Sequence, residues 1–506
     1  SCEEMTDTYT VFNSSLENLK IGSDQSIISG ITHSVFHGFN YSPPEAPWPG
    51  WIRYGGYFNE NNNWWPHFHL LNEYKARLSA LLQNCDMYAD IALLPPMADM
   101  WSLIGMQNEP FPSVLHAEYL SLVWEAIAKN GSGCDYISER ILQDARVEDR
   151  CICYSRRKYQ TLFLVSVESL SPDTASRLLQ FVRAGGRIFC IDTVPSKSTG
   201  WKNHESNDAE VRTMVEKMKA YPHRFIHLEK PENNYIGWYR KVQERYGINP
   251  WLTIEDPDPF LMQVRYSSDD GSEYLFMANS HLHEARFTRL HFSAALSRKH
   301  SISVWNPENG DRQSVDLDTD GGVTIDLGPA ESLLFAFDRE KAREEWKPLP
   351  VTGDGTMTID KGWIAEFRHC RNGFEGKMEM EYLTDLKEIP EYVHFSGTVI
   401  YRTSMECDDP AMMVLNLGKV YGTSELKING ESCGVKWYGR RIYRIEKYLR
   451  PGMNSIEVIV TTSMGNYMKS LTDNPVAQYW TNAGTKNQPL QPMGMTGPVT
   501  CYRNMK

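Results

Sequence analysis

The chain has 506 residues, of which 41% are apolar and 23% are charged, and its formal net charge is −12. This composition is ordinary for a soluble globular protein, and the length predicts about three or four domains. The acidic balance, without a run of Lys or Arg, argues against nucleic acid and anionic membranes as partners. Since no stretch approaches about 18 uninterrupted apolar residues, the sequence predicts no membrane-spanning helix.

Residues 1–110 are predicted to alternate between strands and helices, and this alternation favours a parallel α/β sheet or barrel. The predicted elements are a short helix capped by Ser23-Asp24 and ending at Gly30, a strand over 31–38, a helix over 72–84 and a strand over 90–95. In the strand over 31–38, His33 and His37 share one face because side chains alternate.

An aromatic segment follows this strand, with FNYSPPEAPWPGWIRYGGYF at 39–58 and FNENNNWWPHF at 58–68. Trp and Tyr beside Asn, Glu and His in a Gly/Pro-rich loop are suited to stacking on a sugar ring and bonding its hydroxyls. The alternative is a long surface loop that is anchored by buried aromatic side chains.

Residues 111–220 repeat the α/β rhythm and predict a Rossmann-like, amidotransferase-like domain. Its clearest unit is a strand over 161–167, a helix that starts at Ser171-Pro172-Asp173 and ends at Gly185-Gly186, and a strand over 187–192. Neither GxGxxG nor GxxxxGK[ST] is present, so the fold alone implies no nucleotide.

The remainder is predicted to be mainly β. Residues 201–240 are a polar junction with a helix over 209–221, residues 221–345 have the turn spacing of a β-sandwich, and residues 346–506 form a second all-β block with a hairpin turn at Asn429-Gly430.

Glu3 and Glu4 are the candidate catalytic residues, since acids at the carboxyl end of a barrel strand face the active site. Adjacent strand residues point to opposite faces, so at most one of them enters a pocket. The alternative is two solvated acids near a frayed terminus.

The candidate substrate-binding residues are His37, Asn40, Trp51, Glu60, Trp64 and His33. The alternative for each histidine is a core histidine, and the alternative for Glu60 is a solvated loop acid.

Other chemistries have little support. The ten cysteines form no CxxC pair, and the two histidines lack a third ligand at a diagnostic spacing, so no metal ligand is predicted. No GxSxG elbow or HExxH helix is present.

The run from Glu3-Glu4-Met5-Thr6, through Leu19-Lys20, Asp24, Gly30 and His37-Gly38, to Pro49-Gly50-Trp51 resembles glycoside hydrolase family 106, the α-L-rhamnosidases. Two positions depart from the family pattern. Met5 stands where an aromatic residue is expected, and Thr32 stands where Asn is expected. Residues 415–460 and 491–503 are similar to the galactose-binding-like jelly roll of related sugar hydrolases.

The resemblance implies a multidomain α/β plus all-β protein. Its predicted parts are the C-terminal part of a catalytic (β/α)8 barrel over 1–110, the Rossmann-like domain over 111–220, the β-sandwich over 221–345 and the galactose-binding-like jelly roll over 346–506. On this alignment the chain begins inside the barrel. The rest of the barrel, with the second catalytic carboxylate, is then expected from a preceding segment or a partner chain.

The implied function is hydrolytic removal of a terminal sugar from plant-type polysaccharide, and α-L-rhamnose is the sugar expected first. The implied mechanism uses two carboxyl groups and inverts the anomeric carbon, with Glu3 as the general base. The alternatives are a non-catalytic carbohydrate-binding protein on a hydrolase scaffold and a β-galactosidase-like exo-glycosidase. The resemblance implies calcium as a cofactor, although the sequence contains no calcium-loop pattern. Because large plant glycans are met outside the cytoplasm, a periplasmic or secreted bacterial enzyme is expected.

Overall fold

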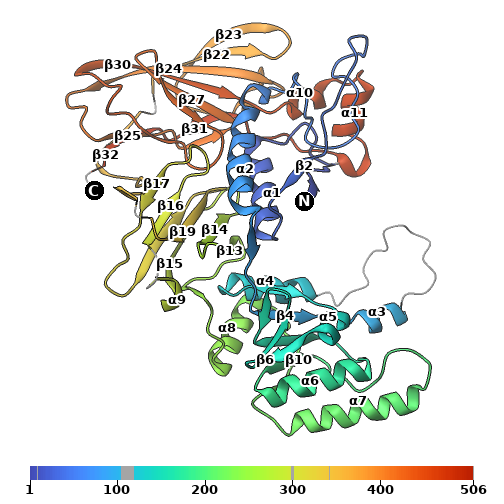
Figure 1. Cartoon of the computed structure of the whole chain (residues 1–506). Coiled ribbons are helices and arrows are strands. Elements are labelled where there is room, and N and C mark those ends of the chain that lie inside the picture. Colours follow the sequence, from blue (N-terminus) through green and yellow to red (C-terminus); the bar gives the residue numbers. More distant parts are fainter. Residues whose placement is uncertain (8, 104–118, 298–300, 341, 360, 505–506) are drawn as a thin grey trace.

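The computed structural model describes residues 1–7, 9–103, 119–297, 301–340, 342–359 and 361–504. A parallel α/β unit forms one end of the molecule, antiparallel β-sheets form the middle, and a second β-domain forms the other end beside the N-terminal segment (Figure 1). The predicted fold class, mixed α/β combined with further β-structure, is confirmed at this level. In the described ranges no helix has the length and apolar character needed to cross a bilayer.

The N-terminal segment contains the parallel strands β1 (Cys2–Glu4) and β2 (Ser34–Phe36), which are joined by helix α1 (Leu16–Ile28). The predicted helix start at Ser23 was wrong. Ser15 caps α1 instead, because its hydroxyl accepts a hydrogen bond from Asn18 N while the Asn18 side chain accepts one from Ser15 N. Ser23 and Asp24 are buried within the helix.

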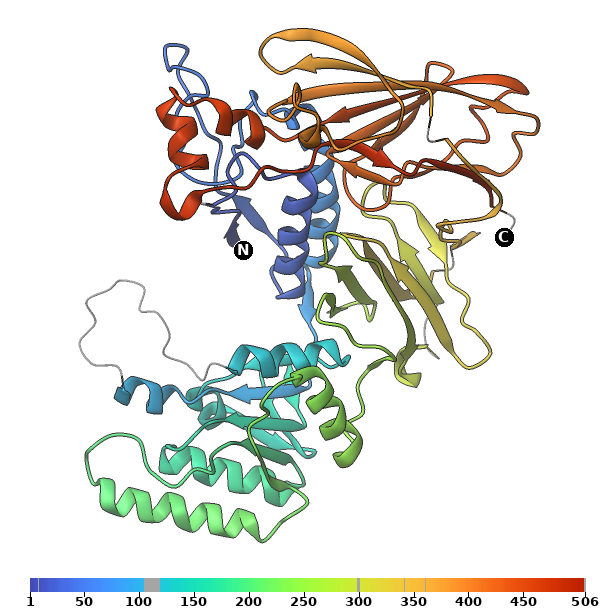
Figure 2. The ribbon, with the colours of Figure 1, turned by 180° about the vertical axis from the view of Figure 1, so that it is seen from behind.

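Helices α1 and α2 (Phe68–Leu82) lie along one face of a large, mostly antiparallel sheet in the middle of the molecule (Figure 2). Lys20 of α1 is fully buried there, and its ammonium bonds Asp24, the carbonyl of Ala330 and the hydroxyl of Ser332. A buried charge is tolerated only when it is paired in this way, so this contact fixes α1 on the sheet. The strand order of the sheet is β20 (Glu344–Glu345), β17 (Arg312–Ser314), β16 (Ser301–Trp305), β19 (Ser332–Asp338), β14 (Glu273–Asn279), β13 (Leu261–Ser268) and β3 (Cys85–Met87).

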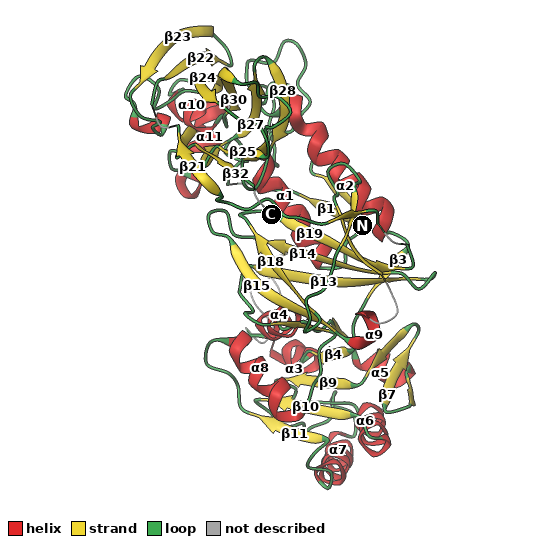
Figure 3. Cartoon of the chain, turned by 90° about the vertical axis from the view of Figure 1, so that its left-hand side faces the viewer, coloured by secondary structure: helices red, strands yellow, loops and turns green. Residues whose placement is uncertain are grey.

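A smaller antiparallel sheet, in the order β12 (Leu252–Ile254), β15 (Arg286–Phe292) and β18 (Gly322–Leu327), shares a core with the large sheet. The short helix α9 (Ala294–Ser297) follows β15. The strands of the two sheets lie next to each other in Figure 3.

The α/β unit is built on a parallel sheet in the order β11 (Phe225–Leu228), β10 (Arg187–Ile191), β9 (Thr161–Val165), β4 (Ile91–Leu94) and β5 (Cys134–Tyr136). Its helices are α3 (Met97–Leu103), α4 (Leu120–Lys129), α5 (Glu139–Asp144), α6 (Pro172–Ala184), α7 (His204–Lys219) and α8 (Tyr235–Tyr246), and a small sheet of β6 (Arg146–Glu148), β7 (Cys151–Tyr154) and β8 (Arg157–Tyr159) packs beside them. The predicted ends of α6 are confirmed. The Ser171 hydroxyl caps its start, and Gly185 ends it with φ +105°.

Two strand assignments were wrong. β4 was predicted within the barrel part over 1–110, but it pairs with β5 and β9. β11 and α8 were predicted within the β-sandwich over 221–345, yet β11 extends the parallel sheet beside β10. Both strands are short, so their sequences do not identify their partners. The predicted boundary between residues 110 and 111 lies outside the described residues.

The C-terminal β-domain has two sheets around one core. One sheet has the order β23 (Gly373–Met380), β22 (Trp363–His369), β24 (Gly397–Cys407), β30 (Gly452–Thr461), β27 (Thr423–Ile428) and β28 (Glu431–Lys436). The other has β21 (Asp354–Thr358), β32 (Thr500–Arg503), β25 (Met413–Asn416) and β29 (Ile442–Arg444), while β26 (Lys419–Tyr421) pairs with β31 (Gly494–Gly497). The predicted hairpin is confirmed, since Asn429 and Gly430 take φ +52° and +84° between β27 and β28. Helices α10 (Gly465–Ser470) and α11 (Pro475–Thr481) project from this domain toward the N-terminal segment.

Candidate active site

Glu3 and Glu4 point to opposite faces of the β1–β2 ribbon, as strand alternation requires. Glu4 is buried, and its carboxylate bonds the Lys75 ammonium and accepts a hydrogen bond of 3.2 Å from the Ser23 hydroxyl. Lys75 also lies 4.1 Å from the centre of the Phe36 ring. The prediction of Glu4 as an alternative catalytic residue is therefore corrected: its charge is neutralised in the interior, where substrate has no access.

Glu3 lies on the open face, with 60% of its side chain exposed. Its Oε1 accepts a hydrogen bond of 2.6 Å from the Thr6 hydroxyl and lies 2.8 Å from His37 Nδ1. The Thr6 hydrogen bond, followed by the contact with His37, lowers the pKa of the Glu3 carboxyl. The carboxylate is therefore ionised at neutral pH, which suits a general base and is unsuited to a general acid.

His37 links Glu3 to an open cleft of about 320 Å³, called here the His37 cleft. It is lined by residues 37–41 and 51–54. The Tyr54 ring meets the imidazole edge to face at 5.6 Å, and Trp51 is 61% exposed. Phe39 and Tyr41 are also more than half exposed. Exposed aromatic faces beside a histidine and a carboxylate form a surface that can hold a sugar ring and bond its hydroxyls.

Backbone contacts hold the cleft together. His37 N donates to Glu4 O at 2.8 Å, and Gly55 N donates to Asp7 O at the same distance. Gly55 has φ +85°, and a Cβ at this position would lie 2.2 Å from His37 O. Only glycine therefore lets the aromatic loop lie this close to the strand end.

The C-terminal β-domain contacts the aromatic segment (residues 39–68) through helices α10 and α11. The Asn474 side chain, at the start of α11, donates to Trp48 O at 2.9 Å, and the Trp48 ring lies 5.7 Å from that of Tyr467. The Tyr57 hydroxyl donates to Pro49 O at 2.7 Å. This contribution from α10 and α11 to the candidate site was not predicted, and the only local signal was the helix start at Asn474-Pro475.

The other predicted binding residues are distributed unevenly. Asn40 lines the cleft, although it is largely buried and its amide donates to Gly38 O. His33 and Glu60 are exposed and lie outside the cleft lining. Trp64 was wrongly predicted as a platform, because it is 3% exposed and its indole donates to Ser14 O at 2.9 Å. It packs in an aromatic cluster with Phe58 and Phe68, so the anchored-loop alternative holds for this half of the segment.

Thr6 was missed as a partner of the candidate base. The two residues are three positions apart, and Met5 between them takes φ +64°. The turn that brings the Thr6 hydroxyl back to Glu3 is a backbone feature with no clear mark in the sequence.

The calcium that the resemblance implies has no cluster of ligands in the described part of the chain. Within the ranges that the structure covers, no three His, Cys, Asp or Glu side chains are grouped so that they could hold a metal ion. The residues at the His37 cleft likewise include no carboxylate cluster of the kind that calcium prefers.

Residues 1–319 match the family described as alpha-L-rhamnosidase, glycoside hydrolase family 106. The chain belongs to this family. The match covers β1, β2 and the whole His37 cleft, so the resemblance that was inferred from Glu3, His37-Gly38 and Pro49-Gly50-Trp51 is confirmed.

One curated sequence and one solved structure are similar to this member of the rhamnosidase family. A protein of Formosa agariphila named "Putative beta-glucuronidase" is 26% identical over 335 residues, 63% of this chain and 25% of that protein. The rhamnosidase structure from Novosphingobium sp. PP1Y has a TM-score of 0.65 at 19% identity and covers 99% of this chain and 47% of its own. The second likeness shows a shared fold. The chain spans a quarter of the curated relative and about half of the solved rhamnosidase.

Proposed function

We propose that the chain is part of an inverting α-L-rhamnosidase in which Glu3 is the general base. The observation that carries this proposal is the ionised Glu3 carboxylate, 2.8 Å from His37 and at the carboxyl end of a parallel strand beside an aromatic cleft. Catalytic carboxylates stand at such strand ends in (β/α)8 barrels.

In the proposed reaction Glu3 takes a proton from a water molecule while the water oxygen bonds to the anomeric carbon. The bond from that carbon to the leaving oxygen breaks, and a general acid protonates this oxygen. His37 and Thr6 hold the Glu3 carboxylate in place through Oε1, which leaves Oε2 for the water. Trp51 is assigned to the sugar platform, and His37 and Asn40 are assigned to its hydroxyls.

We assign the general acid to the carboxyl end of another strand of the same barrel. Inversion needs about 6.5–9.5 Å between the two carboxyl groups. The pairing of β1 with β2 across α1 is a βαβ unit, which supports their place in a barrel. The sheets of residues 252–338 and 354–503 support a β-sandwich and a jelly roll, respectively. A periplasmic or secreted location follows from a polysaccharide substrate.

A second candidate is hydrolysis of a uronic acid glycoside, since the name of the Formosa agariphila relative points to glucuronic acid. Arg53 lines the His37 cleft, and its guanidinium lies 5.6 Å from the Tyr54 ring centre. Among the described residues no carboxylate forms an ion pair with Arg53, whose guanidinium contacts only the Tyr54 ring. A free guanidinium at this position suits the carboxylate of a uronic acid.

An aryl glycoside panel on the complete protein tests both candidates. We expect release of 4-nitrophenol from the α-L-rhamnoside, with the β-anomer of rhamnose as the first product by NMR. Preference for the β-D-glucuronide, abolished in Arg53→Ala, would favour the second candidate, and preference for the β-D-galactoside would favour the β-galactosidase alternative. Glycan binding without turnover of any member of the panel would show a non-catalytic carbohydrate-binding protein and contradict the proposal.

A further inference from the structure

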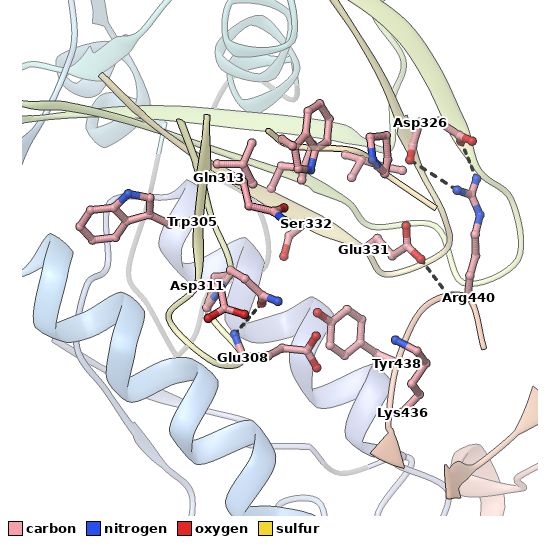
Figure 4. Close-up of a pocket in the computed structure, with 17 residues that line it drawn as sticks. Trp305, Glu308, Asp311, Gln313, Asp326, Glu331, Ser332, Lys436, Tyr438 and Arg440 are labelled. Carbon is pink, nitrogen blue, oxygen red and sulfur yellow. Dashed lines mark hydrogen bonds and ion pairs between the residues drawn. The ribbon is translucent and has the colours of Figure 1, made fainter. Parts of the chain in front are cut away.

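A cavity of about 350 Å³ lies between the large sheet and the C-terminal β-domain, and we call it the interdomain cavity (Figure 4). Its lining comes from the β16–β17 turn, from the end of β18 and the start of β19, from residues 346–348 after β20 and from residues 436–440 at and after the end of β28. A volume of this size lies within the range of about 300–1,000 Å³ that is typical of small-molecule sites.

Several contacts fix the walls of this cavity. Arg440 bonds Asp326 at 2.5 Å, and the Glu331 carboxylate accepts hydrogen bonds from Arg440 N and Gly328 N at 2.9 and 2.8 Å. Arg77 of α2 donates to the carbonyl of Glu308 at 2.6 Å. These charged groups are therefore committed to holding the three chain segments together, and the cavity has a defined shape.

Two other polar side chains that line the cavity, Gln313 and Lys436, make no bond among the described residues that holds its walls. In the described part of the chain, neither the Gln313 amide nor the Lys436 ammonium has a hydrogen-bond or ion-pair partner, apart from the Tyr443 ring 5.6 Å from the ammonium. The Glu308 carboxylate lies beside the Tyr438 hydroxyl. Figure 4 shows these side chains around a common space, with Gln313 facing Glu308 and Tyr438 across it.

The apolar part of the lining includes Trp305, Leu333 and Trp346. Trp346 is anchored edge to face against the buried Phe335 ring at 6.3 Å. The Trp305 indole nitrogen is buried and has no hydrogen-bond partner among the described residues. A lining that combines aromatic surface with unbonded polar groups from Gln313, Lys436 and Trp305 is the pattern of a ligand site rather than of a domain interface alone.

We propose that the interdomain cavity is a second carbohydrate site, which binds one neutral sugar ring away from the His37 cleft. The donors Lys436 and Gln313 and the acceptor Glu308 match hydroxyl groups, which can both donate and accept. A neutral ring is favoured because an anion would meet Glu308 and a cation would meet Lys436. The choice of a sugar as the ligand rests on the proposed function.

Saturation-transfer difference NMR with methyl α-L-rhamnoside and methyl β-D-galactoside tests this site. The complete protein carries His37→Ala, so that binding at the first cleft is weakened. We expect saturation of at least one glycoside, and a dissociation constant about tenfold higher after Gln313→Ala or Lys436→Ala, which corresponds to about 1.4 kcal/mol. Lys361→Ala is the control, since this exposed ammonium also lies only over a ring, Tyr382, at 5.5 Å.

No saturation of either glycoside in the His37→Ala protein, or an unchanged dissociation constant in both cavity variants, would overturn the proposal. Thermal midpoints of the variants are measured alongside, and they should match that of the His37→Ala parent because neither removed side chain makes a structural bond. Turnover of the aryl rhamnoside by the unsubstituted protein separates the two proposals. Absence of this turnover contradicts the proposed function, whereas absence of glycoside binding to the His37→Ala protein contradicts only the second site.

Discussion

Glu3 Oε1 lies 2.8 Å from His37 Nδ1, and the two residues stand at the ends of neighbouring parallel strands. The adjacent acid, Glu4, points the other way and is neutralised by Lys75. Two identical side chains in succession thus have separate tasks, because the strand turns one toward the aromatic cleft and the other into the interior.

The hydrogen bond from Thr6 should set the acidic limit of catalysis. Because it is the largest cause of the lowered pKa of Glu3, Thr6→Val should raise that pKa toward the usual glutamate value. A general base must be ionised, so the acidic limb of the kcat/KM profile should move to higher pH in Thr6→Val. Thr6→Ser, which keeps the hydroxyl, should leave the limb in place, and a limb that is unmoved in both variants would remove Thr6 from this role.

Replacement of Gly55 should abolish most activity for two reasons, its positive φ and its close approach to the His37 carbonyl. Gly55→Ala adds a Cβ 2.2 Å from His37 O at φ +85°, so the loop must move and most of the activity should be lost. Gly271→Ala is a matched control, since Gly271 has the same φ and open space around the position of its Cβ. The control should cost only about 1–2 kcal/mol of stability and leave kcat/KM unchanged. Equal activity losses in the two variants would show that the close approach is unimportant.

Trp51 and Trp64 should behave differently when each is truncated. Trp51→Ala removes an exposed ring from the cleft and should lower kcat/KM by about tenfold or more with little change in thermal stability. Trp64→Ala empties a buried position and should cost about 3–5 kcal/mol of unfolding free energy. Denaturant unfolding and steady-state kinetics on both variants test this, and loss of binding with full stability in Trp64→Ala would contradict the assignment.

Glu366 should make the C-terminal β-domain sensitive to acid. Hydrogen bonds from Arg368, and then from Arg402 and Lys377, lower its pKa to about 2. A lowered carboxyl pKa stabilises the fold above the ordinary glutamate pKa, and this stabilisation is lost as the pH falls toward 2. Glu366→Gln should therefore lower the thermal midpoint by several degrees at pH 7 and much less near pH 2. The exposed Glu381→Gln is the control, and a difference for Glu366→Gln that does not depend on pH would contradict the ion-pair account.

Local signals in the sequence predicted the elements better than their partners. Ser171-Pro172 and Gly185 gave the ends of α6 because caps depend on neighbouring residues. The partners of β4 could not be predicted, since a four-residue apolar strand fits several sheets. The candidate base was found through its place at a strand end, and the resemblance strengthened it.

The aromatic composition of the segment 39–68 did not predict which of its tryptophan side chains are buried. Trp51 and Trp64 lie in the same loop, yet the first is exposed and the second is in the core. The difference depends on tertiary contacts such as the bond from Trp64 to Ser14 O. The support of Trp48 by Asn474 joins residues 426 positions apart, a separation at which no local pattern exists.

The most direct test compares Glu3→Gln with Glu4→Gln in the complete enzyme, with kcat and unfolding free energy measured on both. The account predicts that Glu3→Gln loses several orders of magnitude in kcat and keeps its stability. Glu4→Gln should instead lose about 3–5 kcal/mol of stability, because it leaves Lys75 buried without its counter-ion. Full turnover by the Glu3→Gln protein would contradict the central claim.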